Sequence, residues 1–189
     1  YRFVVITMGQ SFGSWDRGID FDIIYKKLEQ IIKKPINPSR YRQKVGLAYA
    51  IISLCQLRNG SRISEAIEFV KRAIKTKKRK LLVRVRKHKK EDYRLMVLPK
   101  IINSNHLSLI AFIQEIPDKV LRARIEDWLR NHFKINTHSL RYAFITRLSR
   151  LGYTPQIIAA ITGHRNLNYV LKYTQRKAGE LALMQLEEL

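Results

Sequence analysis

The sequence predicts a mainly α-helical fold with one small antiparallel β-hairpin. From Ser39 onward, apolar residues recur three or four positions apart over most of the chain, which is the spacing of one buried face of a helix. Residues 81–87 instead show the two-residue alternation of a strand, with Leu81, Val83 and Val85 on one face and Leu82, Arg84 and Arg86 on the other. A second β-prone run at 93–98 ends before Pro99. A polar turn separates the two runs, so we expect them to pair as a hairpin.

Three helices are expected before the hairpin. The first begins after Asp20, a favourable N-cap residue, and its apolar face is expected to hold Phe21, Ile24, Leu28 and Ile31. The second runs from Tyr41 to Leu57 and ends at a turn over residues 58–60. The third follows this turn and is expected to bury Ile63, Ala66, Ile67, Val70 and Ile74.

Further helices are expected after the hairpin. Ser104 is the predicted N-cap of one that ends near residue 115, and residues 118–132 form another. Thr137 is the predicted cap of the next. A short helix then begins at Thr154 and closes at Gly163, because glycine readily adopts the left-handed conformation that ends many helices.

The charge of the chain favours a polyanionic partner. Lysine and arginine number 37 against 15 aspartate and glutamate residues, a formal net charge of +22. A domain this basic repels itself unless a polyanion compensates the charge, and nucleic acid is the foremost candidate. An anionic membrane surface is a weaker alternative, because no predicted helix pairs a fully apolar face with a lysine-rich one. A solvated, lysine-rich surface of a thermophilic protein is the remaining alternative.

Several classes of protein are disfavoured. No apolar run is long enough to cross a bilayer, and no secretory signal is recognised. Cys55 is the single cysteine, which excludes an intrachain disulfide and a cysteine-rich zinc site. The histidines and acids form no metal-ligand cluster of recognisable spacing. We therefore expect a protein of the cytoplasm or nucleoid, without membrane contact, metal or other cofactor.

Basic side chains concentrate on the expected hairpin. Residues 71–94 hold thirteen of them, and Glu91 and Asp92 are the only acids in this range. A solvated charged loop is one interpretation, but a hairpin can also lay its cations along a phosphate backbone or place its tip in a groove. The side chains expected to contact DNA are Arg84, Arg86, Lys87, Lys90 and Arg94.

Short polar motifs stand apart from the apolar pattern. His138 and Arg141 are three residues apart, so they share one face of a predicted helix. Arg62 and Glu65 have the same spacing at the start of an earlier helix. A glycine–histidine pair at 163–164 closes another helix, and Tyr173 follows nine residues after the histidine. Each motif alone is weak, but their order and spacing together are specific.

Together these motifs resemble those of the tyrosine recombinases, also called site-specific integrases. The family has an arginine followed three residues later by an acid, a His-x-x-Arg motif, and a Gly-His pair with a nucleophilic tyrosine nine residues on. The matching stretches are Gly60-Ser61-Arg62-Ile63-Ser64-Glu65, Thr137-His138-Ser139-Leu140-Arg141-Tyr142-Ala143-Phe144, and Thr162-Gly163-His164 followed by Tyr173. The resemblance covers roughly residues 40–180 and implies the tyrosine-recombinase catalytic-domain fold.

The resemblance implies a DNA strand transferase that works through a 3′-phosphotyrosine intermediate. Breaking a phosphodiester builds negative charge on the non-bridging oxygens, and preorganised cations stabilise that charge. Arg62 and Arg141 are expected to clamp these oxygens, because a guanidinium is always charged and can bind two oxygens at once. His164 is expected to donate a further hydrogen bond to the phosphate, and Glu65 to pair with Arg62 or another local donor.

Tyr173 is the expected nucleophile. Its ordinary pKa is about 10, so it needs a base, and His138 is expected in that role. In the family a lysine at the hairpin tip protonates the leaving 5′-oxygen. We assign this role to Lys89, with Lys87 and Lys90 as alternatives. Because phosphodiester bonds are conserved overall, no ATP is expected.

Two departures from the family pattern concern the fold. The family places a short strand between the helix after its first arginine and the hairpin, but Lys71–Lys80 leave little room for it, so a two-stranded sheet is expected. The family's N-terminal DNA-clamping domain is also much longer than residues 1–36. We interpret residues 1–36 as a linker or a remnant of that region, and 37–189 as the catalytic domain with a C-terminal helix.

Double-stranded DNA is the expected partner. We expect the gene to come from a virus or a plasmid, and the protein to integrate a viral genome. The segment Leu181–Leu189 is apolar. The resemblance implies that it forms a C-terminal helix that docks onto a neighbouring subunit, in a tetrameric assembly on DNA. The alternative is that it folds back onto its own domain. Two other functions stay open: a type IB topoisomerase, and a non-catalytic helix-turn-helix module formed by 137–151 and 155–162.

Overall fold

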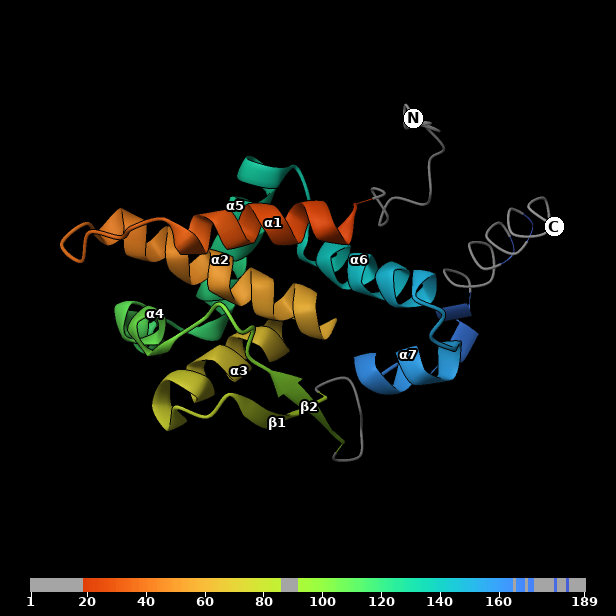
Figure 1. The fold of residues 1–189 in the computed structure, drawn as a ribbon. Helices are drawn as coiled ribbons and strands as arrows, with labels where there is room; N and C mark the ends of the chain where they lie inside the picture. Colours follow the sequence, from red (N-terminus) through yellow and green to blue (C-terminus); the bar gives the residue numbers. More distant parts are fainter. Residues whose placement is uncertain are drawn as a thin grey trace, which may run out of the picture.

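The computed structural model describes residues 19–85, 92–164, 166–168, 170–171, 179 and 183. Over these residues helices make up most of the fold and the sheet has two antiparallel strands, so the predicted fold class is confirmed (Figure 1). None of the helices in this part of the chain combines the length and apolar composition needed to cross a membrane. The elements are α1 (Phe21–Lys33), α2 (Tyr41–Asn59), α3 (Ile63–Thr76), β1 (Lys80–Arg84), β2 (Tyr93–Val97), α4 (Ser104–Leu109), the 3-10 helix η1 (Ala111–Glu115), α5 (Asp118–Phe133), α6 (Thr137–Arg150) and α7 (Pro155–Thr162).

Two predicted N-caps are displaced by one residue. Asn103 rather than Ser104 caps α4, and Asn136 rather than Thr137 caps α6. Each asparagine side chain accepts a hydrogen bond from the backbone N–H three residues further on, at 3.0 and 2.9 Å. The asparagine therefore satisfies a donor of the first turn, and the hydroxyl residue after it is already helical. The helix predicted to reach residue 115 also ends earlier, at Leu109, and η1 follows it.

The first helix packs against the rest of the fold. Asp20 caps α1 as predicted, and the helix lies alongside α2 and contacts α6 (Figure 1). Its buried face includes Ile32 in place of the predicted Ile31, which is only half-buried. The ion pairs that join the start of α1 to α6 are Asp22–Arg147 and Asp20–Arg150. The helix falls within residues 1–36, whose interpretation as a linker or remnant stays a prediction.

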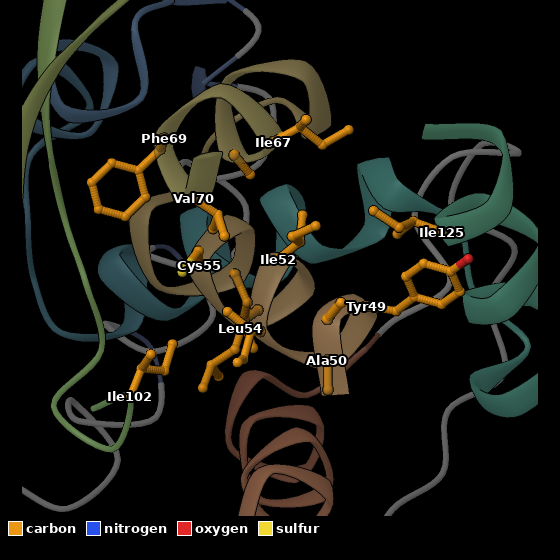
Figure 2. Packing of buried hydrophobic residues seen from close by; sticks show 14 of the residues in the cluster. Tyr49, Ala50, Ile52, Leu54, Cys55, Ile67, Phe69, Val70, Ile102 and Ile125 are labelled. Carbon is orange, nitrogen blue, oxygen red and sulfur yellow. The ribbon is translucent and has the colours of Figure 1, made fainter. Parts of the chain in front are cut away.

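Helix α2 runs through the centre of the hydrophobic core. Every residue from Leu47 to Leu57 is buried, because α1, α3, α5 and α6 all pack against this helix. Figure 2 shows its side chains beside Phe69 and Val70 of α3 and Ile125 of α5. A helical segment that is buried on all sides has little freedom to shift, so the end of α2 that follows this segment is a fixed point for the elements that meet there.

The two strands alternate as the sequence predicts. Leu82 pairs with Leu95 and both are exposed, whereas Val83 and Met96 face the core. Arg94 lies opposite Val83 in the register. Because paired residues of an antiparallel sheet point to the same face, the side chain of Arg94 is turned inward with Val83.

We expect Gly60→Ala to destabilise the protein more than Gly152→Ala. Both glycines have positive φ, 56° and 81°, which costs a residue with a Cβ about 1–2 kcal/mol. At Gly60 a Cβ would also collide with the ring of Phe144, which adds an overpacking cost of about 1–3 kcal/mol, whereas nothing lies within 4 Å of a Cβ at Gly152. Urea unfolding measures both variants, and equal losses would contradict the close packing of α6 on this turn.

Candidate active site

The turn between α2 and α3 holds the first charged group of the site. Arg62 is the N-cap of α3, and its backbone N–H donates to Oε2 of Glu65 at 3.1 Å. The guanidinium of the same residue donates through Nη1 to Oε1 of Glu65 at 3.0 Å. Glu65 is fully buried, while the Arg62 side chain keeps 19% of its surface exposed. The predicted pair is therefore formed, and it holds the arginine at the edge of the core.

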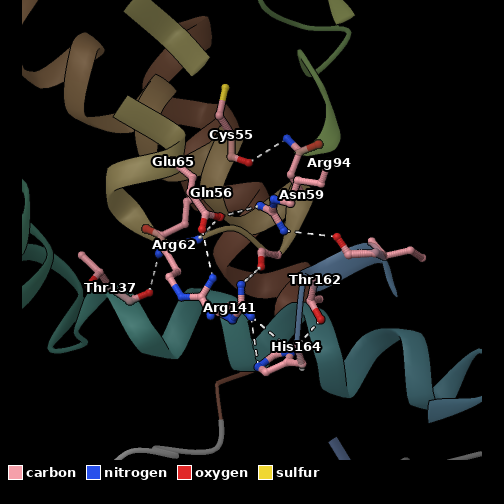
Figure 3. A network of polar contacts seen from close by, with 12 residues as sticks. Cys55, Gln56, Asn59, Arg62, Glu65, Arg94, Thr137, Arg141, Thr162 and His164 are labelled. Carbon is pink, nitrogen blue, oxygen red and sulfur yellow. Dashed lines mark hydrogen bonds and ion pairs between the residues drawn. The ribbon is translucent and has the colours of Figure 1, made fainter. Parts of the chain in front are cut away.

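Arg141 reaches the same turn from α6. It is almost fully buried, and its Nη1 donates to the backbone carbonyl of Gly60 at 2.8 Å. Its Nη2 lies 3.0 Å from Nε2 and 3.2 Å from Nδ1 of His164. Figure 3 shows the guanidinium groups of Arg62 and Arg141 next to each other. The fold thus brings together the two arginines that were expected to form one clamp.

Arg94 is a third guanidinium of this cluster and corrects one expectation. We expected it to contact DNA from the surface of the hairpin, but only 5% of its side chain is exposed. Its Nη2 lies 3.2 Å from Oε2 of Glu65, and its Nη1 donates to the carbonyl of Ile161 near the end of α7 at 3.2 Å. Strand alternation explains the difference, because position 94 shares the inner face with Val83 and Met96.

His164 follows the end of α7. Gly163 ends this helix with a φ of 67°, and the backbone N–H of His164 donates to the carbonyl of Ala159 at 3.0 Å. The side-chain hydroxyl of Thr162 lies 2.6 Å from Nδ1 of the ring. Burial, and then the positive charges of the three arginines, lower the pKa of His164 to about 3. The ring is therefore neutral near pH 7.

Positive charge exceeds negative charge in the cluster. Burial, Arg62 and Arg94 lower the pKa of Arg141 to about 9, and Glu65 opposes this effect. Burial likewise lowers the pKa of Arg94. Like charges in a desolvated site favour any arrangement that neutralises them. A phosphate that reaches Arg62 and Arg141 would do so, and a guanidinium offers it two donors in one plane.

Two amide side chains that the sequence did not single out hold this region together. The Asn59 side chain donates to the carbonyl of Val97 at 3.0 Å and accepts from the N–H of the same residue at 2.9 Å. Gln56 donates to the carbonyl of Thr137 at 2.8 Å. They attach β2 and the start of α6 to the C-terminal end of α2. Asn59 carried only a turn signal in the sequence, and Gln56 carried none.

Two further predicted site residues, His138 and Arg84, belong to the described part of the chain, and both are exposed. His138 is exposed in the first turn of α6, whereas Arg141 one turn later is buried, so their shared spacing does not give them the same environment. Arg84 is exposed on the outer face of the hairpin. Within the described part of the chain, no three metal-ligating side chains gather in one place. The predicted residues outside the described ones are Tyr173, Lys89, Lys87, Lys90, Arg86 and, except for Leu183, Leu181–Leu189.

Comparison with known protein sequences identifies similar proteins over most of the chain. The model of the phage integrase family matches residues 24–180. A putative integrase of Acidianus two-tailed virus is 36% identical over 169 residues, which cover 89% of this chain and 67% of that protein. A putative integrase of Sputnik virophage is 32% identical over 87% of this chain and 86% of its own length. An uncharacterized protein of Methanocaldococcus jannaschii is 34% identical over 94% and 91%.

Among solved structures, the fold is similar to that of the XerH site-specific recombinase in its pre-cleavage complex with the difH substrate. The TM-score is 0.53 and the sequence identity 17%, so the likeness is one of fold. The matched region covers 92% of this chain and 55% of the recombinase, so the chain spans about half the length of that protein.

We expect Arg94→Met to destabilise the protein by about 3 kcal/mol, because it leaves the buried carboxylate of Glu65 with one of its two guanidinium partners. Arg84→Met is the matched control on the same hairpin. Arg84 is exposed, so its loss should change stability by less than about 0.5 kcal/mol. Urea unfolding of both variants measures the difference. Equal stabilities would mean that the buried ion pair contributes nothing to the fold.

The stability of the protein should fall as the pH is lowered from 7 to 5, partly because of His164. Its pKa is about 3 in the folded protein and about 6.5 in the unfolded chain, so below pH 6.5 the unfolded state binds a proton that the folded state does not. His164→Asn removes this contribution. Urea unfolding across this pH range should give a shallower dependence for the variant, and an unchanged slope would show that the folded protein binds the proton equally well.

Proposed function

The chain belongs to the phage integrase family, the tyrosine recombinases, and we propose that it is a site-specific recombinase that cuts and rejoins DNA through a 3′-phosphotyrosine intermediate. The family and the recombinase fold support site-specific recombination as the general class of activity. The observation that carries the proposal is that Arg62 and Arg141 lie next to each other (Figure 3). Arg62 donates to the carboxylate of Glu65, and Arg141 donates to the backbone carbonyl of Gly60.

The two arginines would bind the non-bridging oxygens of the scissile phosphate. The excess positive charge of the buried cluster supports this role, because its cations are already ordered before charge develops on the phosphate. Arg62 is the more exposed of the two and would make the first contact with DNA. Glu65 would keep its guanidinium in place, and Arg94 would hold Glu65 from the side of the hairpin.

Tyr173 would supply the nucleophile. Its phenol oxygen would bond to phosphorus while the bond from phosphorus to the 5′-oxygen breaks. His138, exposed on the helix that carries Arg141, would take the phenol proton. Lys89, or alternatively Lys87 or Lys90, would protonate the leaving oxygen. A 5′-hydroxyl of another strand would then reverse these steps and release the tyrosine.

DNA binding would involve the outer face of the hairpin and the charge of the whole chain. Arg84 is exposed on that face and would contact a phosphate, and the net charge of +22 supports a polyanionic partner. Residues 37–189 would form the catalytic domain, and Leu181–Leu189 would join neighbouring subunits in a tetramer on DNA. The similarity to putative integrases of two viruses supports a viral origin and a role in integrating a viral genome.

Tyr173→Phe should abolish covalent attachment to a nicked suicide DNA substrate while leaving DNA binding unchanged. The substitution removes the hydroxyl that would bond to phosphorus and keeps the ring. Denaturing gels detect the covalent complex, mass spectrometry identifies the modified peptide, and a mobility shift measures binding.

Tyr153→Phe is the matched control, since Tyr153 is an exposed tyrosine between α6 and α7. It should form the covalent complex at the normal rate. A covalent complex with Tyr173→Phe would refute the choice of nucleophile, and relaxation of supercoiled DNA without strand exchange would favour a topoisomerase.

A further inference from the structure

Thr162 is a fully buried hydroxyl residue at the end of α7, two residues before His164. Its Oγ1 makes two short contacts. One is with the backbone carbonyl oxygen of Ile158, one turn earlier, at 2.6 Å. The other is with Nδ1 of His164, also at 2.6 Å. The hydroxyl therefore lies between a helix carbonyl and the imidazole ring.

The Thr162 hydroxyl has one proton, and it can donate that proton to only one of its two contacts. A carbonyl oxygen can only accept a hydrogen bond, so two oxygens 2.6 Å apart require the Thr162 proton between them. With that proton used, Oγ1 can only accept from His164. Nδ1 of the ring must then carry a hydrogen and donate it.

The surroundings of the ring are consistent with one proton on the imidazole and not two. Arg141 lies next to the ring, with its Nη2 3.0 Å from Nε2 and 3.2 Å from Nδ1, and a guanidinium only donates. Arg62 and Arg94 add positive charge from α3 and β2, and Glu65 supplies the opposing negative charge. A neutral ring with its hydrogen on Nδ1 leaves a lone pair on Nε2, which is the nearer of the two ring nitrogens to Nη2 of Arg141.

We propose that Thr162 is a positioning residue that fixes His164 in the tautomer with hydrogen on Nδ1, so that Nε2 is a proton acceptor in the DNA-free protein. The functional consequence, which rests on the proposed recombinase activity, changes the role first expected for His164. A neutral ring in this tautomer cannot donate from Nε2 to a phosphate. It donates there only after Nε2 binds a second proton, which a phosphate that neutralises the arginines would favour.

Nitrogen-15 NMR of the histidine side chains at pH 7 tests the tautomer directly, because protonated and unprotonated ring nitrogens resonate at well-separated frequencies. His164→Asn assigns the His164 signals by their loss. His106 provides an internal reference for the other tautomer, the one with hydrogen on Nε2. Its Nδ1 accepts a hydrogen bond from the backbone N–H of Asn103 at 3.2 Å. We expect His164 to show hydrogen on Nδ1 and His106 to show hydrogen on Nε2.

The variants separate the hydroxyl from the rest of the side chain. Thr162→Ser keeps the hydroxyl and should keep the tautomer, whereas Thr162→Val should lose the Nδ1-protonated pattern. Thr76→Val is the matched control, because the Thr76 hydroxyl makes the same bond to the carbonyl one turn earlier, at 2.7 Å, at the far end of α3 from Arg62. It should leave the His164 signals unchanged. If Thr162→Val does not fold, Thr162→Ala removes the same hydroxyl with less bulk.

Three results would overturn the proposal: hydrogen on Nε2 of His164 in the unsubstituted protein, a doubly protonated ring at pH 7, or an unchanged tautomer after loss of the Thr162 hydroxyl. The NMR result does not depend on catalysis. If the unsubstituted protein formed no covalent complex with a suicide substrate, the recombinase proposal would fail while the tautomer could still be confirmed. If both hold, Thr162→Val should change the pH profile of cleavage and Thr162→Ser should restore it.

Discussion

The carboxylate of Glu65 is the charge on which the rest of the site depends. It is fully buried and interacts with the side chains of Arg62 and Arg94, which come from different parts of the chain. Without it, the repulsion between the guanidinium groups of this desolvated cluster would lose the main negative charge that opposes it among the described residues. This one carboxylate thus joins the start of α3 to β2. It also allows the guanidinium groups to lie close together before any substrate binds.

Much of the fold could be predicted because its elements follow local rules. The alternation within 81–87 predicted the first strand, observed at Lys80–Arg84, and the buried positions of α3 followed from helical spacing. The caps of α4 and α6 were displaced by one residue because an asparagine precedes a hydroxyl residue in each case, and either can cap a helix. The predicted DNA contact of Arg94 was wrong because the prediction was based on the charge of the side chain. Its position in the strand, which already turns the side chain inward, was not considered.

The candidate site was harder to predict, because its contacts join distant parts of the chain. Arg62 and Arg141 were found through a resemblance in motifs, and no periodicity in the sequence could have shown that they meet. Asn59 and Val97 are 38 positions apart, and their paired hydrogen bonds become visible only when α2 and β2 are placed together. The contact between Thr162 and His164 is local, but it requires the left-handed turn at Gly163 to bring the ring back onto the helix end.

Two of the three arginines are anchored by main-chain oxygens: Arg141 binds the carbonyl of Gly60, and Arg94 binds the carbonyl of Ile161. An acceptor of this kind is present whatever amino acid occupies the position. The side chain of Ile161 is 39% exposed, so evolution can exchange it without deleting the oxygen that Arg94 needs. The path of the backbone, more than the identity of neighbouring side chains, is then what a lineage must preserve for these cations to stay where they are.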